Sequence, residues 1–349
     1  MTCSQNLEDD GSKSLHEDTK TRCLSVQTER VSALAFSHIK FDWPLEMKHN
    51  RDFDPNYGTP IELTPGIRRL TANNPGPFTF HGTNTYLLGE RRIAVVDPGP
   101  ASADHIDAIL EASKGAAIEA ILVSHTHMDH SPGARLLQQE TGAPIVGCGP
   151  HRAARALLED EINPLDSSGD KTYRPDRHLS DGEVFSVAGL EIETVETPGH
   201  TANHLCFALA GEDILMSADH VMGWSTSIVA PPDGSMRDYM SSIDKLLGRS
   251  ETVYLPGHGA EVRQAIDYVQ ELKQHRLDRE SAILKQLAAG GRTIPDVVAT
   301  LYADVDPALH PAAALSVFAH LEDLAQKGLV VAAPDLSLSA VYQLIRDES

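Results

Sequence analysis

A run of six residues, His125–His130, carries three histidines and one aspartate directly after an apolar stretch. The apolar residues, Ala120–Ser124, predict a buried strand, and polar side chains at a strand end lie in a loop on a rigid edge. Neutral imidazole and carboxylate groups are ligands that suit zinc and similar divalent cations. Because four such side chains within six residues are unusual in a solvated turn, the run predicts a metal site at the end of a strand.

Three more ligand-type residues, His200, Asp219 and His258, each follow an apolar run further along the chain. Both of these histidines are preceded by Pro-Gly, a pair typical of a tight turn after a strand. If the four strand ends converge, there are enough ligands for two cations; the alternative is four unrelated turns. The complete candidate set is His125, His127, Asp129, His130, His200, Asp219 and His258.

The order His-x-His-x-Asp-His, then His, Asp and His, resembles the signature of the metallo-β-lactamase superfamily of binuclear hydrolases. Further segments resemble the branch of β-lactamase-like protein 2: Asn74–Pro77, Gly82–Tyr86, Thr197–Thr201, Asp238–Met240 and Tyr254–Gly259. The resemblance implies an α/β fold, a four-layered αβ/βα sandwich of two mixed sheets with helices outside. A helical, winged-helix C-terminal domain would follow it.

The same resemblance implies roles for the candidate ligands. It assigns His125, His127 and His200 to one zinc ion, Asp129, His130 and His258 to a second, and Asp219 to a bridge between them. Two such ions, about 3.5–4 Å apart, can share a hydroxide nucleophile, and Asp129 is expected to orient it as the catalytic residue. Asp97 either fixes the tautomer of a ligating imidazole or only begins the Pro98-Gly99 turn. Ala218 stands where the family usually has glycine.

Patterning divides the chain into three parts. Residues 1–40 are polar and lack periodicity, which predicts disorder or an extension outside the fold. Residues 41–260 carry the strand and helix patterns expected of the catalytic domain. Within them, residues 151–180 predict a helix and then a long polar loop that is either mobile or shapes the pocket. Residues 261–349 predict a long helix, two shorter helices and a β-ribbon, the outline of a winged helix.

The charge of the chain bears on its partners. A net charge of −21 opposes attraction to nucleic acid and to anionic membranes. From residue 290 on, three basic side chains stand against eight acidic ones, and Ala312–Ala325 contains neither Lys nor Arg. We therefore expect the winged helix to have a structural role or to form a wall of the substrate site, rather than to bind duplex DNA.

Other features concern the compartment. No apolar stretch approaches the roughly 18 residues of a membrane span, and no pattern of a signal or transit peptide is present. The four cysteines, Cys3, Cys23, Cys148 and Cys206, lack the spacing of a disulfide framework or a Cys-x-x-Cys site. These features predict a cytoplasmic protein without a membrane partner, and they leave the oligomeric state open.

We therefore predict a binuclear zinc-dependent hydrolase with two Zn²⁺ per chain, acting on a small-molecule ester, thioester or lactone through a metal-bridging hydroxide. The alternative is a metal-dependent endoribonuclease on single-stranded RNA, an activity that the resemblance implies. Its track needs basic and aromatic side chains, and residues 151–180 offer Arg152, Arg155, Lys171, Tyr173, Arg174 and Arg177. A third possibility, a non-enzymatic winged-helix regulator, conflicts with the acidic charge of the C-terminal residues. A fourth, an iron sulfur-dioxygenase, would be distinguished from a zinc hydrolase by analysis of the bound metal.

Overall fold

The computed structural model describes residues 47–158 and 161–345. Residues 1–40, for which an extension is predicted, lie outside this range, as do Cys3 and Cys23. Among the described residues, Cys148 and Cys206 form no disulfide, and both are buried. No helix among the described residues is long and apolar enough to cross a membrane.

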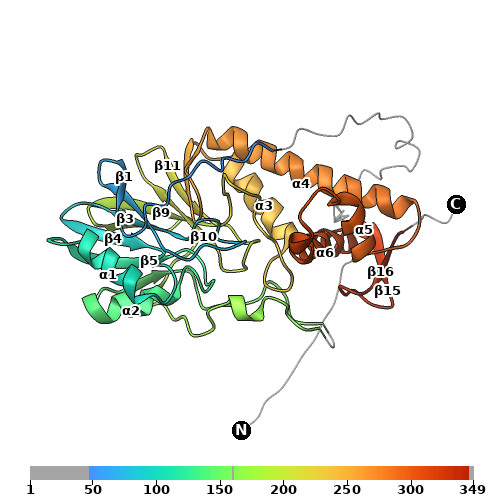
Figure 1. The fold of residues 1–349 in the computed structure, drawn as a ribbon, viewed down its shortest axis with the longest axis horizontal. Helices are drawn as coiled ribbons and strands as arrows, with labels where there is room; N and C mark the ends of the chain where they lie inside the picture. Colours follow the sequence, from blue (N-terminus) through green and yellow to red (C-terminus); the bar gives the residue numbers. More distant parts are fainter. Residues whose placement is uncertain (1–46, 159–160, 346–349) are drawn as a thin grey trace, which may run out of the picture. The chain divides into compact units, whose positions relative to one another are not determined.

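Seven strands form the first sheet, in the spatial order of the sequence: β1 (Ile61–Thr64), β2 (Ile67–Thr71), β3 (Asn84–Leu88), β4 (Arg92–Val96), β5 (Ala117–Val123), β6 (Ile145–Gly147) and β7 (Arg177–His178). β1 to β4 pair antiparallel and β4 to β7 parallel. The helices α1 (Ala103–Ala112) and α2 (Pro132–Thr141) connect parallel neighbours and cover the outer face of this sheet (Figure 1). We call His125–His130, the run that follows β5, the signature turn. Parallel strands end at one edge, so Asp97 after β4 and the signature turn after β5 lie side by side.

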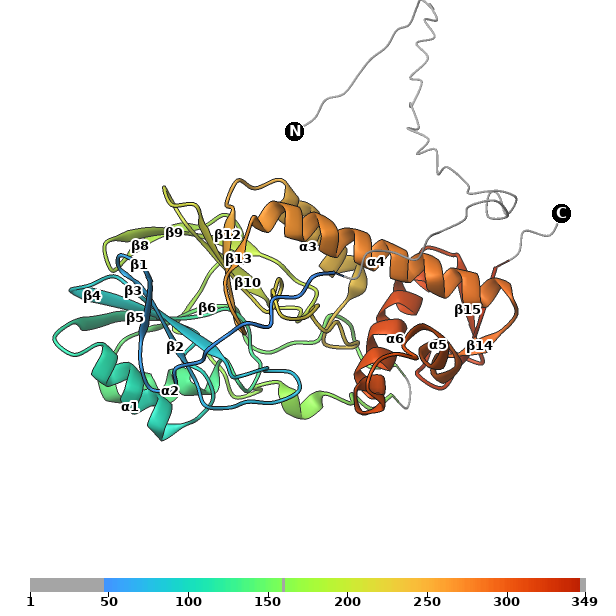
Figure 2. The same cartoon turned by 45° about the horizontal axis from the view of Figure 1, so that its top comes forward.

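The second sheet has six strands in the order β13-β12-β11-β10-β9-β8. These are β8 (Val184–Val187), β9 (Leu190–Glu196), β10 (Leu205–Leu209), β11 (Ile214–Ala218), β12 (Val253–Pro256) and β13 (Val262–Arg263). The helices α3 (Met236–Leu247) and α4 (Ala265–Ala288) lie outside it (Figure 2). Apolar side chains of both sheets share one core, with Leu87 and Leu122 on one side and Phe207 and Met216 on the other. The predicted αβ/βα sandwich is therefore confirmed.

The C-terminal part is a winged helix, as predicted. It contains β14 (Arg292–Thr293), α5 (Ile294–Leu301), α6 (His310–Gln326), β15 (Val330–Ala333) and β16 (Val341–Leu344). The three strands pair in the order β14-β16-β15. Their core includes Val297, Phe318, Leu321 and Tyr342 together with Ile283 of α4, so the last turns of α4 serve as the first helix of this domain.

The helix α6 is enclosed on more than one side. Eight consecutive residues, 317–324, are buried. Phe318 and Leu321 face the winged-helix core, whereas Ala319 packs in a cluster with residues of the second sheet, α3 and α4. Because a helix that reads a DNA groove needs an exposed face, the burial of this stretch is consistent with the structural role expected from its charge.

The segment 151–180 differs from the prediction. Its described residues form no α-helix, and their regular elements are a 3₁₀ turn at Asp166–Ser168 and β7. The backbone instead bonds to the signature turn, with Met128 N–H donating to Ser168 O (2.8 Å) and Asp170 N–H to Thr126 O (2.7 Å). These tertiary bonds override the local helical preference of its alanines and leucines. The segment thus forms part of the wall around the signature turn.

Candidate metal centre

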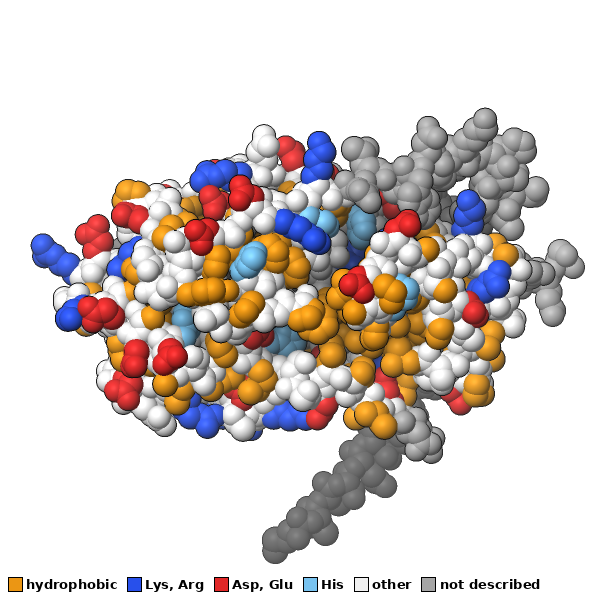
Figure 3. All heavy atoms as spheres, in the orientation of Figure 1, with side chains coloured by type: hydrophobic (Ala, Val, Ile, Leu, Met, Phe, Trp, Pro, Cys, Tyr) orange, Lys and Arg blue, Asp and Glu red, His pale blue; other side chains and the backbone are white. Residues whose placement is uncertain are grey.

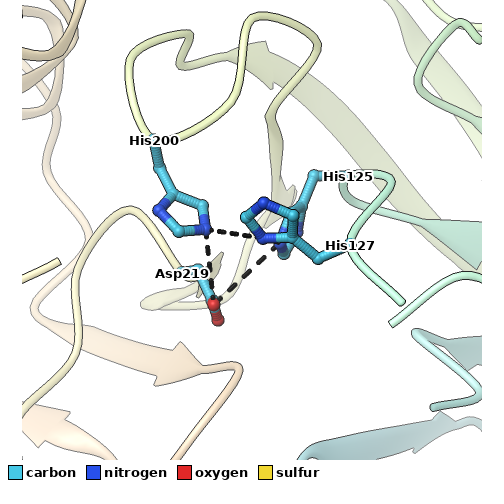
Figure 4. Close-up of side chains that lie close together, drawn as sticks. All are labelled: His125, His127, His200 and Asp219. Carbon is cyan, nitrogen blue, oxygen red and sulfur yellow. Dashed lines mark hydrogen bonds and ion pairs between the residues drawn. The ribbon is translucent and has the colours of Figure 1, made fainter. Parts of the chain in front are cut away.

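The strand ends converge as the spacing predicted. β5, β11 and β12 end directly before or within two residues of His125, Asp219 and His258, and β9 ends shortly before His200. Figure 4 shows His125, His127, His200 and Asp219 directed toward one another. The structure brings all seven predicted side chains together in two groups of potential ligands that meet at Asp219. We call His125, His127 and His200 the first cluster, and Asp129, His130 and His258 the second cluster.

Three imidazoles make up the first cluster. Nδ1 of His127 lies 3.1 Å from Nε2 of His125 and 3.0 Å from Nε2 of His200. Oδ2 of Asp219 is 3.6 Å from Nε2 of His200 and 3.9 Å from Nε2 of His125. Four potential ligand atoms therefore surround one small volume.

One carboxylate and two imidazoles make up the second cluster. Oδ2 of Asp129 lies 3.2 Å from Nε2 of His130 and 3.3 Å from Nε2 of His258. Asp219 reaches this cluster as well, with Oδ1 3.4 Å from Nε2 of His130 and Oδ2 3.3 Å from Nε2 of His258. Asp219 is thus positioned between the two clusters.

Outer hydrogen bonds determine which ring nitrogen faces the centre. Nδ1 of His200 lies 2.7 Å from the carbonyl oxygen of Ile228, and Nδ1 of His258 lies 3.1 Å from that of Gly82. A carbonyl only accepts, so each Nδ1 carries a proton and each Nε2 is the nitrogen left to face the centre as a ligand. Nδ1 of His130 donates in the same way to Oδ2 of Asp97 at 3.0 Å.

Asp97 therefore fixes the tautomer of a ligating imidazole, the first of the two roles considered for it. It also accepts from the backbone N–H of Ser124 (2.8 Å) and from its hydroxyl (2.6 Å). That hydroxyl in turn accepts from Nδ1 of His125 at 3.0 Å. Although Asp97 lies within ligand distance of His125 and His130, it faces the outer nitrogen of His130 and supports the ligands from behind.

The donor set fits a divalent cation. Inward lone pairs 3.0–3.4 Å apart repel one another unless a positive charge lies among them. Oδ1 of Asp219 is buried and has no hydrogen-bond donor among the described residues. Five imidazoles and two carboxylates are a ligand set that zinc and its neighbours prefer.

The two clusters differ in their electrostatics. Burial, aided by the neighbouring His200, lowers the pKa of His127 to about 3, and burial also holds the pKa of His125 well below its usual range. In the second cluster burial again opposes charge, but Asp219 and Asp129 outweigh it and raise the pKa of His258 to about 10. The first cluster therefore offers neutral ligands, whereas the second favours positive charge.

Two backbone features shape the centre. Ala218 has a φ of +42°, a left-handed conformation that costs a non-glycine residue roughly 1 kcal/mol, which explains why the family usually has glycine there. At Gly257, an added Cβ would lie 2.2 Å from Oδ1 of Asp219 and 2.7 Å from Cε1 of His130. Only glycine allows β12 to approach the ligands this closely.

Some residues around the centre were not predicted from the sequence. The hydroxyl of Thr83 donates to Oδ2 of Asp129 at 2.9 Å, and Nδ1 of His151 lies 3.0 Å from the hydroxyl of Thr126. Ser227 and Arg276 hold the loop after Asp219. Thr83 falls in a segment whose resemblance was noted, but no local pattern marks the other three, because their partners are distant in the chain.

His204 and His220 lie behind the clusters. Nδ1 of His204 is 2.9 Å from the hydroxyl of Thr197, and the ring of His220 packs on that of Tyr239 with centroids 4.4 Å apart. Burial lowers the pKa of both histidines. Neither belongs to a ligand group among the described residues. Trp224 stacks on Phe80 (4.8 Å between centroids) and is largely buried.

Comparison with known proteins places this arrangement in a family. A family model described as "Metallo-beta-lactamase superfamily" matches residues 78–258, which include all seven ligand-type residues. The chain belongs to the metallo-β-lactamase superfamily. Members of this superfamily are metal-dependent hydrolases, and this chain is an enzyme of that class. A second model, "Beta-lactamase associated winged helix domain", matches residues 293–337.

Individual relatives agree with this membership. A β-lactamase-like protein 2 homolog of Caenorhabditis elegans is 32% identical over 280 residues, covering 78% of this chain and 88% of that protein. An atrochrysone carboxyl ACP thioesterase of Aspergillus fumigatus is 31% identical over 228 residues, covering 64% of each chain. The crystal structure of a β-lactamase domain protein from Burkholderia ambifaria has the same fold, with a TM-score of 0.71, 20% identity and coverage of 84% of this chain and 96% of that one.

Proposed function

We propose that this superfamily member holds two zinc ions and hydrolyses a small-molecule ester, thioester or lactone. The observation that carries the proposal is the pair of ligand clusters that share Asp219. His125, His127 and His200 would hold one ion, Asp129, His130 and His258 the other, and Asp219 would bridge them. Bound zinc polarises a carbonyl group and lowers the pKa of water toward neutrality.

The protein's own contribution to the reaction lies in Asp129. Its side chain is 25% exposed, whereas those of His130 and His258 are 0% and 1% exposed. Asp129 is therefore the member of the second cluster that a substrate and a water molecule can reach. The hydroxyl of Thr83 donates to one carboxylate oxygen, which fixes the group in position to orient the attacking water. The stacked Phe80–Trp224 pair would bound the apolar side of the substrate.

The relatives favour a thioester as the first substrate to test. The Aspergillus fumigatus relative is named as a thioesterase acting on an acyl carrier protein, and a second relative of the same name comes from Aspergillus chevalieri. A thioester and an ester require the same attack on a carbonyl carbon, so one centre can serve both.

Single-stranded RNA is less well supported as a substrate. Of the six residues in 151–180 that could form an RNA track, Tyr173 is buried. Each of the five basic side chains already has a partner within the protein. The partners are Ala202 O for Arg152, Glu161 and Glu322 for Arg155, Asp166 for Lys171, two carbonyl oxygens for Arg174, and Glu183 for Arg177. A strand-binding track needs accessible cations and exposed aromatic faces. On the face drawn in Figure 3, Lys and Arg side chains are dispersed among Asp and Glu.

The proposal is tested with zinc-loaded protein, a series of acyl thioesters of increasing chain length, and end-labelled single-stranded RNA. Asp129→Ala protein is the control for both substrates. We expect thioester hydrolysis by the wild type and its loss in the variant. Cleavage of RNA by the wild type alone, without thioester hydrolysis, would instead assign the chain as a ribonuclease.

A further inference from the structure

The loop from Asp219 to Ile228 connects both ligand clusters. It begins with the shared ligand Asp219, and its last residue, Ile228, accepts the hydrogen bond that orients His200. Between them, the hydroxyl of Ser227 lies in hydrogen-bond contact with the carbonyl oxygens of Asp219 and His220. Ser227 therefore ties the backbone of one ligand to the residue that orients another.

Arg276 of α4 holds this loop from behind. Its guanidinium donates to the carbonyl oxygen of Ser227 and lies over the ring of Tyr239, 5.0 Å from the centroid. The side chain is 3% exposed, and among the described residues its Nε has no hydrogen-bond partner and no carboxylate lies within ion-pair distance. A buried cation without a counterion is costly, so its position calls for a compensating role.

The winged helix packs on the same buried cluster: Ala319 of α6 belongs to it together with Tyr239, whose ring Arg276 covers. His320 of α6 is 1% exposed, and neither of its ring nitrogens has a partner among the described residues. Burial, and next the charge of Arg276, hold the pKa of His320 well below its usual range, so this imidazole adds no positive charge near Arg276. In such a dry environment a charge-assisted hydrogen bond is stronger than in water.

Two ion pairs fix α6 against the sandwich. Glu322 pairs with Arg155, whose backbone N–H, like that of Ala154, donates to the carbonyl oxygen of Pro232. Asp323 pairs with Arg237 of α3 at 3.1 Å. The helix that would read a DNA groove in a nucleic-acid-binding winged helix is thus held against the catalytic body.

We propose that Arg276 is a positioning residue for the metal centre and that the winged helix, through α6, forms the dry surrounding that this role requires. Arg276 fixes Ser227, and through it the placement of Asp219 and His200. The winged-helix domain then acts as a structural part of the catalytic unit. The inference rests on the proposed metal centre but not on the identity of its substrate.

Arg279 provides a matched control on the same helix. It also donates to a carbonyl oxygen, that of Leu301 at 3.0 Å, and lies over a tyrosine ring, that of Tyr302 at 4.3 Å. Arg279 contacts the winged helix, whereas Arg276 contacts the loop of the metal ligands. Both replacements therefore remove the same kinds of interaction but differ in what those interactions hold, and Arg276 is the more deeply buried of the two.

The test compares Arg276→Met and Arg279→Met for zinc affinity, by competition with a chromophoric chelator, and for the visible absorption spectrum of bound Co²⁺. Loss of a partner that orients a metal ligand costs about 10- to 100-fold in metal affinity. We expect a loss of that size and an altered Co²⁺ spectrum for Arg276→Met. Arg279→Met should lower the melting temperature and leave zinc affinity and spectrum unchanged. Equal zinc affinities and spectra for the two variants would overturn the proposal.

A second variant keeps the test decisive if Arg276→Met does not fold. Ser227→Ala removes only the hydroxyl that joins the carbonyls of Asp219 and His220, and it should weaken zinc binding several-fold with Arg276 in place. Unchanged affinity in Ser227→Ala would contradict the inference. Zinc binding is measured without substrate, so a failure to hydrolyse any thioester would overturn the proposed function without affecting this result.

Discussion

The first and second clusters lie side by side and share Asp219, yet they present opposite charge preferences. In the first, burial keeps the imidazoles neutral, and the pKa of His127 is lowered to about 3. In the second, burial is outweighed by Asp219 and Asp129, which raise the pKa of His258 to about 10. Two sites built from similar ligands can therefore differ in how strongly protons compete with the metal.

The largest effect is expected from removing Asp219, the ligand that the two clusters share. Asp219→Ala deletes the carboxylate that lies within 3.9 Å of four imidazoles. We expect zinc affinity to fall at both sites by more than the roughly 100-fold cost of losing an outer partner, with loss of hydrolysis. Metal content by mass spectrometry, alongside the melting temperature as a check on folding, measures this. Retention of two tightly bound zinc ions would contradict the shared role.

The response to pH should separate the clusters. The pKa of His258 is raised, so at pH 7 the imidazole is protonated until a metal displaces the proton, and binding at the second cluster strengthens as pH rises. The effect is about tenfold per pH unit for each proton displaced. The imidazoles of the first cluster have lowered pKa values, so protons compete less with the metal there and the dependence of zinc binding on pH should be weaker. Calorimetric zinc titrations from pH 6 to pH 9 would reveal two different slopes; identical slopes would refute the distinction.

A smaller effect comes from the outer partner of His130. Asp97→Asn keeps the shape of the side chain but weakens the acceptor that fixes the tautomer of His130. We expect a loss of about 10- to 100-fold in zinc affinity at the second cluster. The first cluster should lose less, because Asp97 reaches His125 only through Ser124. A greater loss at the first cluster would show that the outer hydrogen bonds are assigned wrongly.

The smallest effect is expected from a substitution that leaves zinc binding at both clusters unchanged. Ala218→Gly removes the methyl group from a residue with a φ of +42°. Relief of the left-handed strain is worth roughly 1 kcal/mol, partly offset by the greater freedom of glycine in the unfolded chain. Denaturant unfolding should show a free energy equal to or slightly above that of the wild type, with zinc affinity unchanged. A marked loss of stability would mean that the methyl group makes a packing contact instead.

Whether the sequence predicted a residue of this site depends on how far apart in the chain the interacting residues stand. All seven ligand-type residues lie in turns that follow strands, a local signal, and their convergence follows from the edge shared by neighbouring strands. Arg276 has no such signal, because it is 49 positions from Ser227 and meets it only once α4 packs on the second sheet. The helix expected at the start of 151–180 was wrong because backbone bonds to Pro232 and the signature turn outweigh local preference. The domain division at residue 260 stays a prediction, since α4 contributes to two cores.

One titration would show whether a centre of two zinc ions hydrolyses acyl substrates in this protein. Metal-free protein receives increasing amounts of zinc per chain while the initial rate of thioester hydrolysis is recorded. For a centre of two zinc ions, we expect the rate to climb until two zinc ions are bound per chain and then to level off. Full activity with one zinc ion, or hydrolysis that does not depend on zinc, would contradict this expectation.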